Sequence, residues 1–227
     1  SRTLATSSAP PLRTRLAVAT GAPPPPPPPP ACDVVKTILG DRISGKFQQL
    51  YLDSRGQAIS DSTQREIGAA AWTCNTQGMP TCNFRSLFRY DVSDIPLNAV
   101  IVSAKLQLYA NKDNDIGYAG SPTYGSQNTS LLQRVTDYWP VTGTGWNNQP
   151  AITTAQQKTL VQRTHTAQNY EVDMKDFVQY WVNNPDSNYG VLFRLKTEQY
   201  YNSMIFHSGQ SADSVKPRLE ISYTLPT

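Results

Sequence analysis

The residue types that most often perform catalysis are few in this chain, and they are not arranged for it. The two histidines, His165 and His207, lie in separate strand-like segments without the HxH or HExxH spacing of a metal site. The sequence also has no GxSxG turn, no glycine-rich phosphate-binding loop and no GxGxxG motif. Acidic residues such as Asp91 and Asp173 are scattered in positions typical of turns and helix caps. We therefore predict that the chain is not an enzyme.

Two aspartates in a polar segment are the candidates for a metal site. Asp113 and Asp115 stand two residues apart in the sequence KDNDIG, and carboxylate oxygens are the ligands that calcium prefers. The segment lacks the complete loop and the final glutamate of a helix–loop–helix calcium site. We predict no cofactor, and calcium at these two aspartates stays open as an alternative.

Aromatic side chains in polar surroundings are the residues best suited to binding sugars, because an exposed ring can stack on a sugar ring. Trp139, Tyr200 and Tyr201 lie in such surroundings, and so do Tyr118 and Tyr124. If the chain has a sugar ligand, we expect Tyr200 or Trp139 to stack on it.

Three cysteines bear on the compartment in which the chain works. Cys74 and Cys82 bracket the sequence NTQGMPT, whose glycine and proline favour a loop that brings the two sulfur atoms together. We predict a disulfide here, with two free thiols as the alternative. A disulfide is typical of an oxidising compartment, which indicates a secreted or cell-surface protein. Cys32 is then left as a free thiol or as a cross-link to another chain.

The elements that must position these residues are predicted to be β-strands. In the stretch 83–111, apolar and polar residues alternate with a period of two on either side of a connector that contains Pro96. In the second half, Ala104, Leu106 and Leu108 share one predicted face with Val102. In the first half, the aromatic residues at 84, 88 and 90 alternate with Arg85, Leu87 and Arg89. Further short strands are predicted at 34–39, 48–53 and 67–73.

One helix is predicted near 173–184. Its apolar residues recur at helical spacing, and Asp173 stands where an N-cap is expected. The sequence Asn183-Asn184-Pro185 would end it. The stripe predicts a structural role for Trp181, and Trp146 in the turn GWNNQP is also expected to pack. The stripe consists of Met174, Phe177, Val178, Trp181 and Val182.

Composition excludes two classes of partner. The formal charge of +3 comes from dispersed residues, with no basic cluster interleaved with aromatic residues, which argues against a nucleic-acid partner. No apolar run approaches the roughly 20 residues that span a bilayer. We predict no nucleic-acid partner and no membrane span.

Six sequence blocks, taken in order, resemble the DNRLRE-domain family and cover about residues 34–224. The resemblance implies an all-β, antiparallel sandwich of jelly-roll type in a secreted bacterial or archaeal protein. Some members are classed as carbohydrate-binding modules, and others lie in large surface proteins. The chain departs from the family pattern in its 74–82 loop, its 112–130 insertion and its N-terminal arm. The blocks are RSLFRYDVSDIP (85–96), SAKLQLYA (103–110), LLQRVTDYWPVTGTGWNNQPA (131–151), FVQYWVNNP (177–185), YGVLFRL (189–195) and KPRLEISY (216–223).

The first 31 residues differ in composition from the predicted domain at 32–227. Pro23 to Pro30 form an unbroken proline run, which adopts a stiff, extended helix of roughly 25 Å. Ahead of it lies a segment with strand-like alternation. The arm is then either a proline-rich linker or a strand that pairs with a neighbouring subunit. The alternating residues are Leu12, Thr14, Leu16, Val18 and Thr20.

Two functions follow from these features. The arm and the unpaired cysteine favour a structural protein that assembles with copies of itself, head to tail, into a filament. The alternative is a carbohydrate-binding module or adhesin that recognises a polysaccharide. From the sequence we favour the structural protein.

Overall fold

The computed structural model describes residues 34–56, 66–76 and 78–225. The chain divides into two units, Ser1–Pro30 and Ala31–Thr227, and the first lies wholly outside the described residues. Cys32 and the predicted arm strand at 12–20 therefore lie outside the described part of the chain. The domain boundary, the docking of the arm and the assembly into a filament stay predictions.

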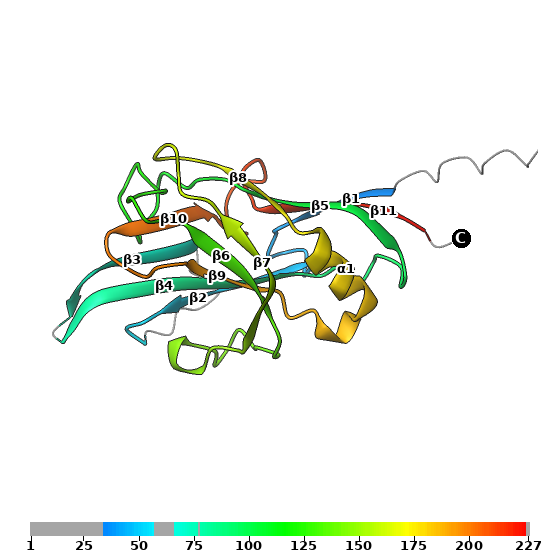
Figure 1. The fold of residues 1–227 in the computed structure, drawn as a ribbon, viewed down its shortest axis with the longest axis horizontal. Helices are drawn as coiled ribbons and strands as arrows, with labels where there is room; N and C mark the ends of the chain where they lie inside the picture. Colours follow the sequence, from blue (N-terminus) through cyan, green and yellow to red (C-terminus); the bar gives the residue numbers. More distant parts are fainter. Residues whose placement is uncertain (1–33, 57–65, 77, 226–227) are drawn as a thin grey trace, which may run out of the picture. The chain divides into compact units, whose positions relative to one another are not determined.

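The domain is an antiparallel β-sandwich with one short α-helix among its described residues, which confirms the predicted fold class (Figure 1). The smaller sheet has the order β1-β11-β5-β8, and the larger has the order β10-β3-β4-β9-β6-β7, with β2 paired to β4. The strands are β1 (Val34–Leu39), β2 (Phe47–Asp53), β3 (Glu66–Thr76), β4 (Met79–Tyr90), β5 (Val100–Leu108), β6 (Ser130–Val135), β7 (Ile152–Leu160), β8 (Tyr170–Asp173), β9 (Val191–Leu195), β10 (Asn202–His207) and β11 (Arg218–Thr224).

Strand β5 shows how the alternation builds the core and where it breaks. Ala104, Leu106 and Leu108 are buried in the main core, as their alternation predicts. Val102 is 41% exposed, so its predicted inward position is wrong. The register between β5 and β11 shifts at this point, because Ser222 pairs with Ser103 whereas the next residue of β11 pairs with Ile101. Val102 is thus the extra residue of a β-bulge, and Ile101 takes the buried place.

Strand β4 is buried on both faces over part of its length. Phe88 lies in the main core between the sheets, and Leu87 on the opposite face is also fully buried. Leu87 belongs to a second apolar cluster with Leu50 and Leu192, and residues of the segment 136–151 pack onto that cluster. A half-buried strand is therefore the wrong description for this part of β4.

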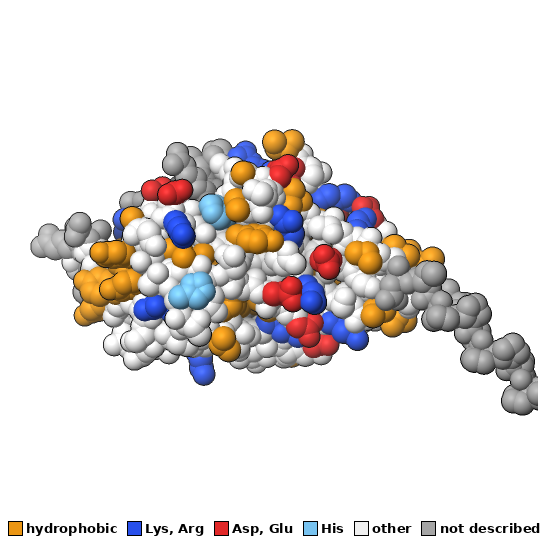
Figure 2. All heavy atoms as spheres, turned by 90° about the horizontal axis from the view of Figure 1, so that it is seen from above, with side chains coloured by type: hydrophobic (Ala, Val, Ile, Leu, Met, Phe, Trp, Pro, Cys, Tyr) orange, Lys and Arg blue, Asp and Glu red, His pale blue; other side chains and the backbone are white. Residues whose placement is uncertain are grey.

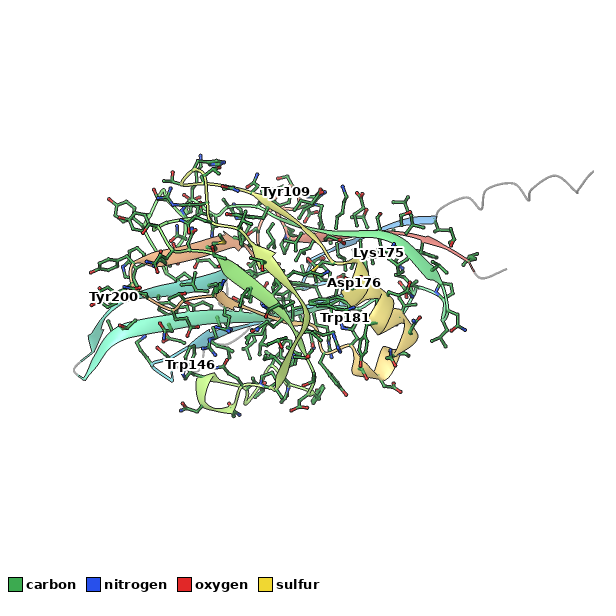
Figure 3. The ribbon with its side chains drawn as sticks, in the orientation of Figure 1. Tyr109, Trp146, Lys175, Asp176, Trp181 and Tyr200 are labelled. Carbon is green, nitrogen blue, oxygen red and sulfur yellow. A yellow bond between two sulfur atoms is a disulfide. The ribbon has the colours of Figure 1, made fainter. Side chains whose placement is uncertain are left out.

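The helix α1 (Lys175–Asn183) confirms the predicted apolar stripe. Phe177, Val178, Trp181 and Val182 are all buried, and Trp181 points from α1 toward the sheets (Figure 3). The N-cap is Met174 rather than the predicted Asp173, because helical geometry begins one residue later. The Asp173 carboxylate still accepts a hydrogen bond from the Lys175 N–H at 2.9 Å. Two short 3-10 turns lie at Trp146–Asn148 and Pro185–Ser187.

The predicted disulfide between Cys74 and Cys82 is present. It joins neighbouring strands β3 and β4, with the two Cα atoms 5.4 Å apart. Within the described residues, no helix is long and apolar enough to cross a bilayer.

Loss of this disulfide is expected to lower stability measurably. Replacing both Cys74 and Cys82 by serine removes a constraint on the unfolded chain, and we expect a loss of about 2–3 kcal/mol in the free energy of unfolding. Urea titration of the purified domain measures the loss. Reduction of the wild-type disulfide should reproduce it, and unchanged stability in both experiments would contradict the prediction.

Candidate functional site

Five aromatic side chains form a continuous cluster, in which each ring contacts the next. Tyr118 stacks on Tyr124 with ring centres 5.3 Å apart and planes inclined by 17°. Tyr124 meets Trp72 edge-on at 5.6 Å, and Trp72 meets Tyr201 edge-on at 4.9 Å. Tyr201 in turn meets Tyr200 at 5.4 Å. We call these five residues the aromatic cluster.

Strands β3 and β10 bring the centre of the cluster together. Ala69 and Ala71 of β3 point into the main core, so Trp72 projects from the opposite face of that strand. Ala71 pairs with Asn202 at the start of β10, which places the preceding Tyr201 beside Trp72. Hydrophobic side chains gather at the end of the domain that carries β3 and β10 (Figure 2).

The tyrosines contributed by the 112–130 segment are held by backbone pairing. Tyr124 and Ser203 of β10 exchange two backbone hydrogen bonds, each of 3.0 Å. The fully buried Asn128 donates to the Ser203 carbonyl oxygen at 3.1 Å. The Asn202 side-chain oxygen accepts a hydrogen bond from the Gln127 N–H at 2.8 Å. These bonds attach the 112–130 segment, which carries Tyr118 and Tyr124, to β10, which directly follows Tyr200 and Tyr201. Strand β10 therefore holds both ends of the cluster in place.

The outward side of the cluster is open to solvent. Tyr118 is 56% exposed, Tyr200 49% and Tyr201 46%, whereas Trp72 and Tyr124 are half-buried beneath them. The Thr73 hydroxyl donates to the Tyr201 hydroxyl at 3.4 Å. A row of exposed rings held in fixed positions can stack on the apolar faces of sugar rings at little cost in side-chain entropy.

The structure separates Trp139 from the other predicted stacking residues. Trp139 is 2% exposed and lies in the second apolar cluster with Leu87 and Leu192. Its indole N–H donates to the Tyr189 carbonyl oxygen at 2.7 Å. The prediction that Trp139 stacks on a ligand is therefore wrong, because the polar sequence around it folds over the outer face of β4 and buries the ring.

Trp146 packs against the same apolar cluster and also carries a charged neighbour. The Arg85 guanidinium lies 4.4 Å from the centre of the Trp146 ring. Arg85 also donates to both carboxylate oxygens of Glu198, at 2.6 and 2.8 Å, and to Gln149 at 2.9 Å. Trp146 lies away from Tyr200 in Figure 3. These contacts agree with the packing role expected for Trp146.

The two aspartates considered for calcium line different hollows. Asp113 lines a hollow with His207, and Asp115 lines another with Trp72. In the described part of the chain, no group of three or more His, Cys, Asp or Glu side chains could hold a metal ion. The calcium alternative gains no support from this arrangement.

Burial lowers the pKa of His207, whose ring lies 3.1 Å from the Ser211 hydroxyl.

Trp72 is the member of the cluster that the sequence analysis did not single out. It lies in the predicted strand at 67–73, where Ile67, Ala69 and Ala71 form the buried side. The alternation alone therefore placed Trp72 on the outward face of an alanine-rich strand. A large aromatic ring on the outward face of a strand whose buried face carries mainly alanine could have marked Trp72 as a candidate binding residue.

Comparison with known families places the chain in one of them. Residues 68–223 match the model of carbohydrate-binding module family 96, and the chain belongs to this family. No curated protein was found to match the chain. The match supports the predicted likeness to carbohydrate-binding modules without testing the DNRLRE resemblance itself. It favours the carbohydrate-binding alternative over the filament that we favoured from the sequence.

Proposed function

We propose that this chain is a non-catalytic module that binds a polysaccharide through the aromatic cluster, and that it works in a secreted or cell-surface protein. The observation that carries the proposal is the unbroken contact between five rings, three of which are close to half exposed. Membership of a carbohydrate-binding module family supports a sugar as the ligand. The disulfide supports an oxidising compartment.

An extended ligand suits the cluster better than a compact one. The rings run from Tyr118 through Trp72 to Tyr200 and come from strand β3 and two loops, so a polymer can contact several of them at once. A contact between one sugar and one ring buries little surface and is weak by itself. Useful affinity therefore requires a ligand whose repeating units contact more than one ring.

Substitutions at the two ends of the cluster test the proposal. Tyr200→Ala and Tyr118→Ala each remove an exposed ring, and we expect each to weaken polysaccharide binding about tenfold, which corresponds to ~1.4 kcal/mol. The double variant should bind too weakly to detect. Affinity electrophoresis of the purified domain in gels that contain different polysaccharides measures the effect.

Tyr138→Ala is the matched control, because Tyr138 is 66% exposed and its ring neighbour is Tyr189 rather than a member of the cluster. Its mobility in each gel should equal that of the wild-type protein. Equal losses in the Tyr138 and Tyr200 variants would contradict the assignment of the site. Failure of every polysaccharide to retard the wild-type domain would contradict the proposed function.

A further inference from the structure

One buried side chain joins the two loops that carry the tyrosines of the aromatic cluster. Asn202 is 4% exposed and is the first residue of β10, directly after Tyr201. Its side-chain oxygen accepts a hydrogen bond from the Gln127 N–H at 2.8 Å, and its side-chain nitrogen donates to the Gln199 carbonyl oxygen at 2.6 Å. Gln127 belongs to the 112–130 segment, whereas Gln199 lies in the loop that leads into β10. The same amide group is therefore bonded to both loops.

The two loops also pack directly against each other at Asn202. Gly125 has a φ of +90°, and a Cβ atom there would collide with the Asn202 side-chain oxygen and with the Tyr201 carbonyl oxygen. The Gly125 carbonyl oxygen accepts hydrogen bonds from the side chains of Gln162, at 3.1 Å, and Arg163, at 3.0 Å. The chain at Gly125 is thus held against Asn202 on one side and by these two bonds on the other.

The aromatic cluster consists of two pairs of tyrosines with Trp72 between them. Tyr118 and Tyr124 come from one loop, and Tyr200 and Tyr201 come from the other. Trp72 meets one ring of each pair edge-on, so the spacing between the pairs depends on how the two loops are held. A polymer that contacts both pairs gains affinity only if this spacing is fixed before it binds.

We propose that Asn202 is a positioning residue that fixes the spacing between the two tyrosine pairs, and that this spacing lets one polysaccharide chain contact both pairs at once. The inference rests on the proposed function, because the polymer lies on the aromatic cluster. Asn202 acts through the rings and not by touching the polymer, because its side chain is buried and both of its polar atoms are bonded to the two loops.

Nuclear Overhauser contacts between ring protons test the positioning without any ligand. The wild-type domain should show contacts from Trp72 to the rings of Tyr124 and Tyr201, whose centres lie 5.6 and 4.9 Å away. Asn202→Ala removes both hydrogen bonds, and we expect at least one of the two ring contacts to be lost. Asn202→Asp keeps the accepting oxygen but replaces the donor to the Gln199 carbonyl, so it should disturb the contact with Tyr201.

Affinity electrophoresis tests the consequence for binding, in gels that contain hydroxyethyl cellulose, xylan, galactomannan, pectin or alginate. In the gel that retards the wild-type domain most, Asn202→Ala should weaken binding about tenfold. Tyr118→Ala should then cost about threefold or less in the Asn202→Ala background, against about tenfold in the wild-type domain, because the chain no longer contacts both pairs. If Asn202 had only a structural role, the cost of Tyr118→Ala would be the same in both backgrounds.

Gln179→Ala is the matched control. The Gln179 side chain also joins two backbone groups, since it accepts from the Ile101 N–H at 2.8 Å and donates to the Ala99 carbonyl oxygen at 3.0 Å, but it lies on α1. Its loss should lower stability in urea and leave the ring contacts and the mobility in each gel unchanged.

Retention of both ring contacts in the Asn202 variants, or an equal cost of Tyr118→Ala in both backgrounds, would overturn the inference. If no polysaccharide retards the wild-type domain, the proposed function falls, and the ring contacts alone decide whether Asn202 positions the cluster. If the wild-type domain binds a polysaccharide and Asn202→Ala binds it equally well, only the inference falls.

Discussion

Replacing Trp181 by alanine is expected to lower the free energy of unfolding by about 3–5 kcal/mol. The side chain is 2% exposed, lies in the main core and contacts Phe177 of the same helix with ring centres 5.9 Å apart. Its removal leaves a cavity between α1 and the sheets, and the closely packed helix and strands around it cannot close it. Urea denaturation followed by circular dichroism measures the loss.

Trp181→Phe separates the cavity from the polar group. The indole N–H of Trp181 is buried and finds no hydrogen-bond partner among the described residues. Phenylalanine fills most of the same space and removes that unpaired donor, so we expect a loss of about 1 kcal/mol or less. A loss from Trp181→Phe as large as that from Trp181→Ala would show that the cavity is not the cause.

Replacing Gly190 by alanine is expected to destabilise the domain by roughly 2–5 kcal/mol, the sum of backbone strain and a steric clash. Gly190 has a φ of +74°, a conformation that costs other residues free energy. A Cβ atom there would collide with the Phe88 carbonyl oxygen and would lie 2.8 Å from the Arg89 Cα. Both of these atoms belong to the backbone of β4 and cannot move aside cheaply.

Gly45→Ala supplies the control for backbone strain alone. Gly45 has a nearly identical φ of +69°, but a Cβ atom there meets nothing within 4 Å. We expect a loss of about 1–2 kcal/mol from the positive φ. Similar thermal unfolding midpoints for the two variants would mean that the clash with β4 contributes little.

Much of the fold could be predicted from local patterns, because burial between two sheets imposes a period of two on each strand. The period-two segments and the helical stripe around Trp181 are both present where the sequence placed them. The errors occurred where tertiary structure overrides the pattern. Val102 faces solvent because a bulge shifts the register, and Leu87 is buried because a distant segment covers it.

The candidate site was harder to predict than the fold. Tyr118, Tyr124, Tyr200 and Tyr201 were predicted as candidate sugar-binding rings from their polar surroundings, but the sequence gives no sign that they touch. Their contact depends on the pairing of Tyr124 with Ser203 in β10, across a long sequence separation. The prediction for Trp139 was wrong because its position also depends on tertiary contacts. Its segment is polar in sequence but packs onto β4, which buries the ring.

The pairing of β1 with β11 determines how the domain would respond to mechanical force. Val34 at the start of β1 pairs with Tyr223 near the end of β11, so the chain enters and leaves the domain at the same end of this strand pair. Tension between the flanking segments would therefore load the hydrogen bonds of the pair one after another, as in a zipper, rather than all together. Because β1 is an edge strand among the described residues, it can peel away while β11 keeps its other neighbour, β5. The smaller sheet would thus yield under load before the larger sheet and its exposed rings are disturbed.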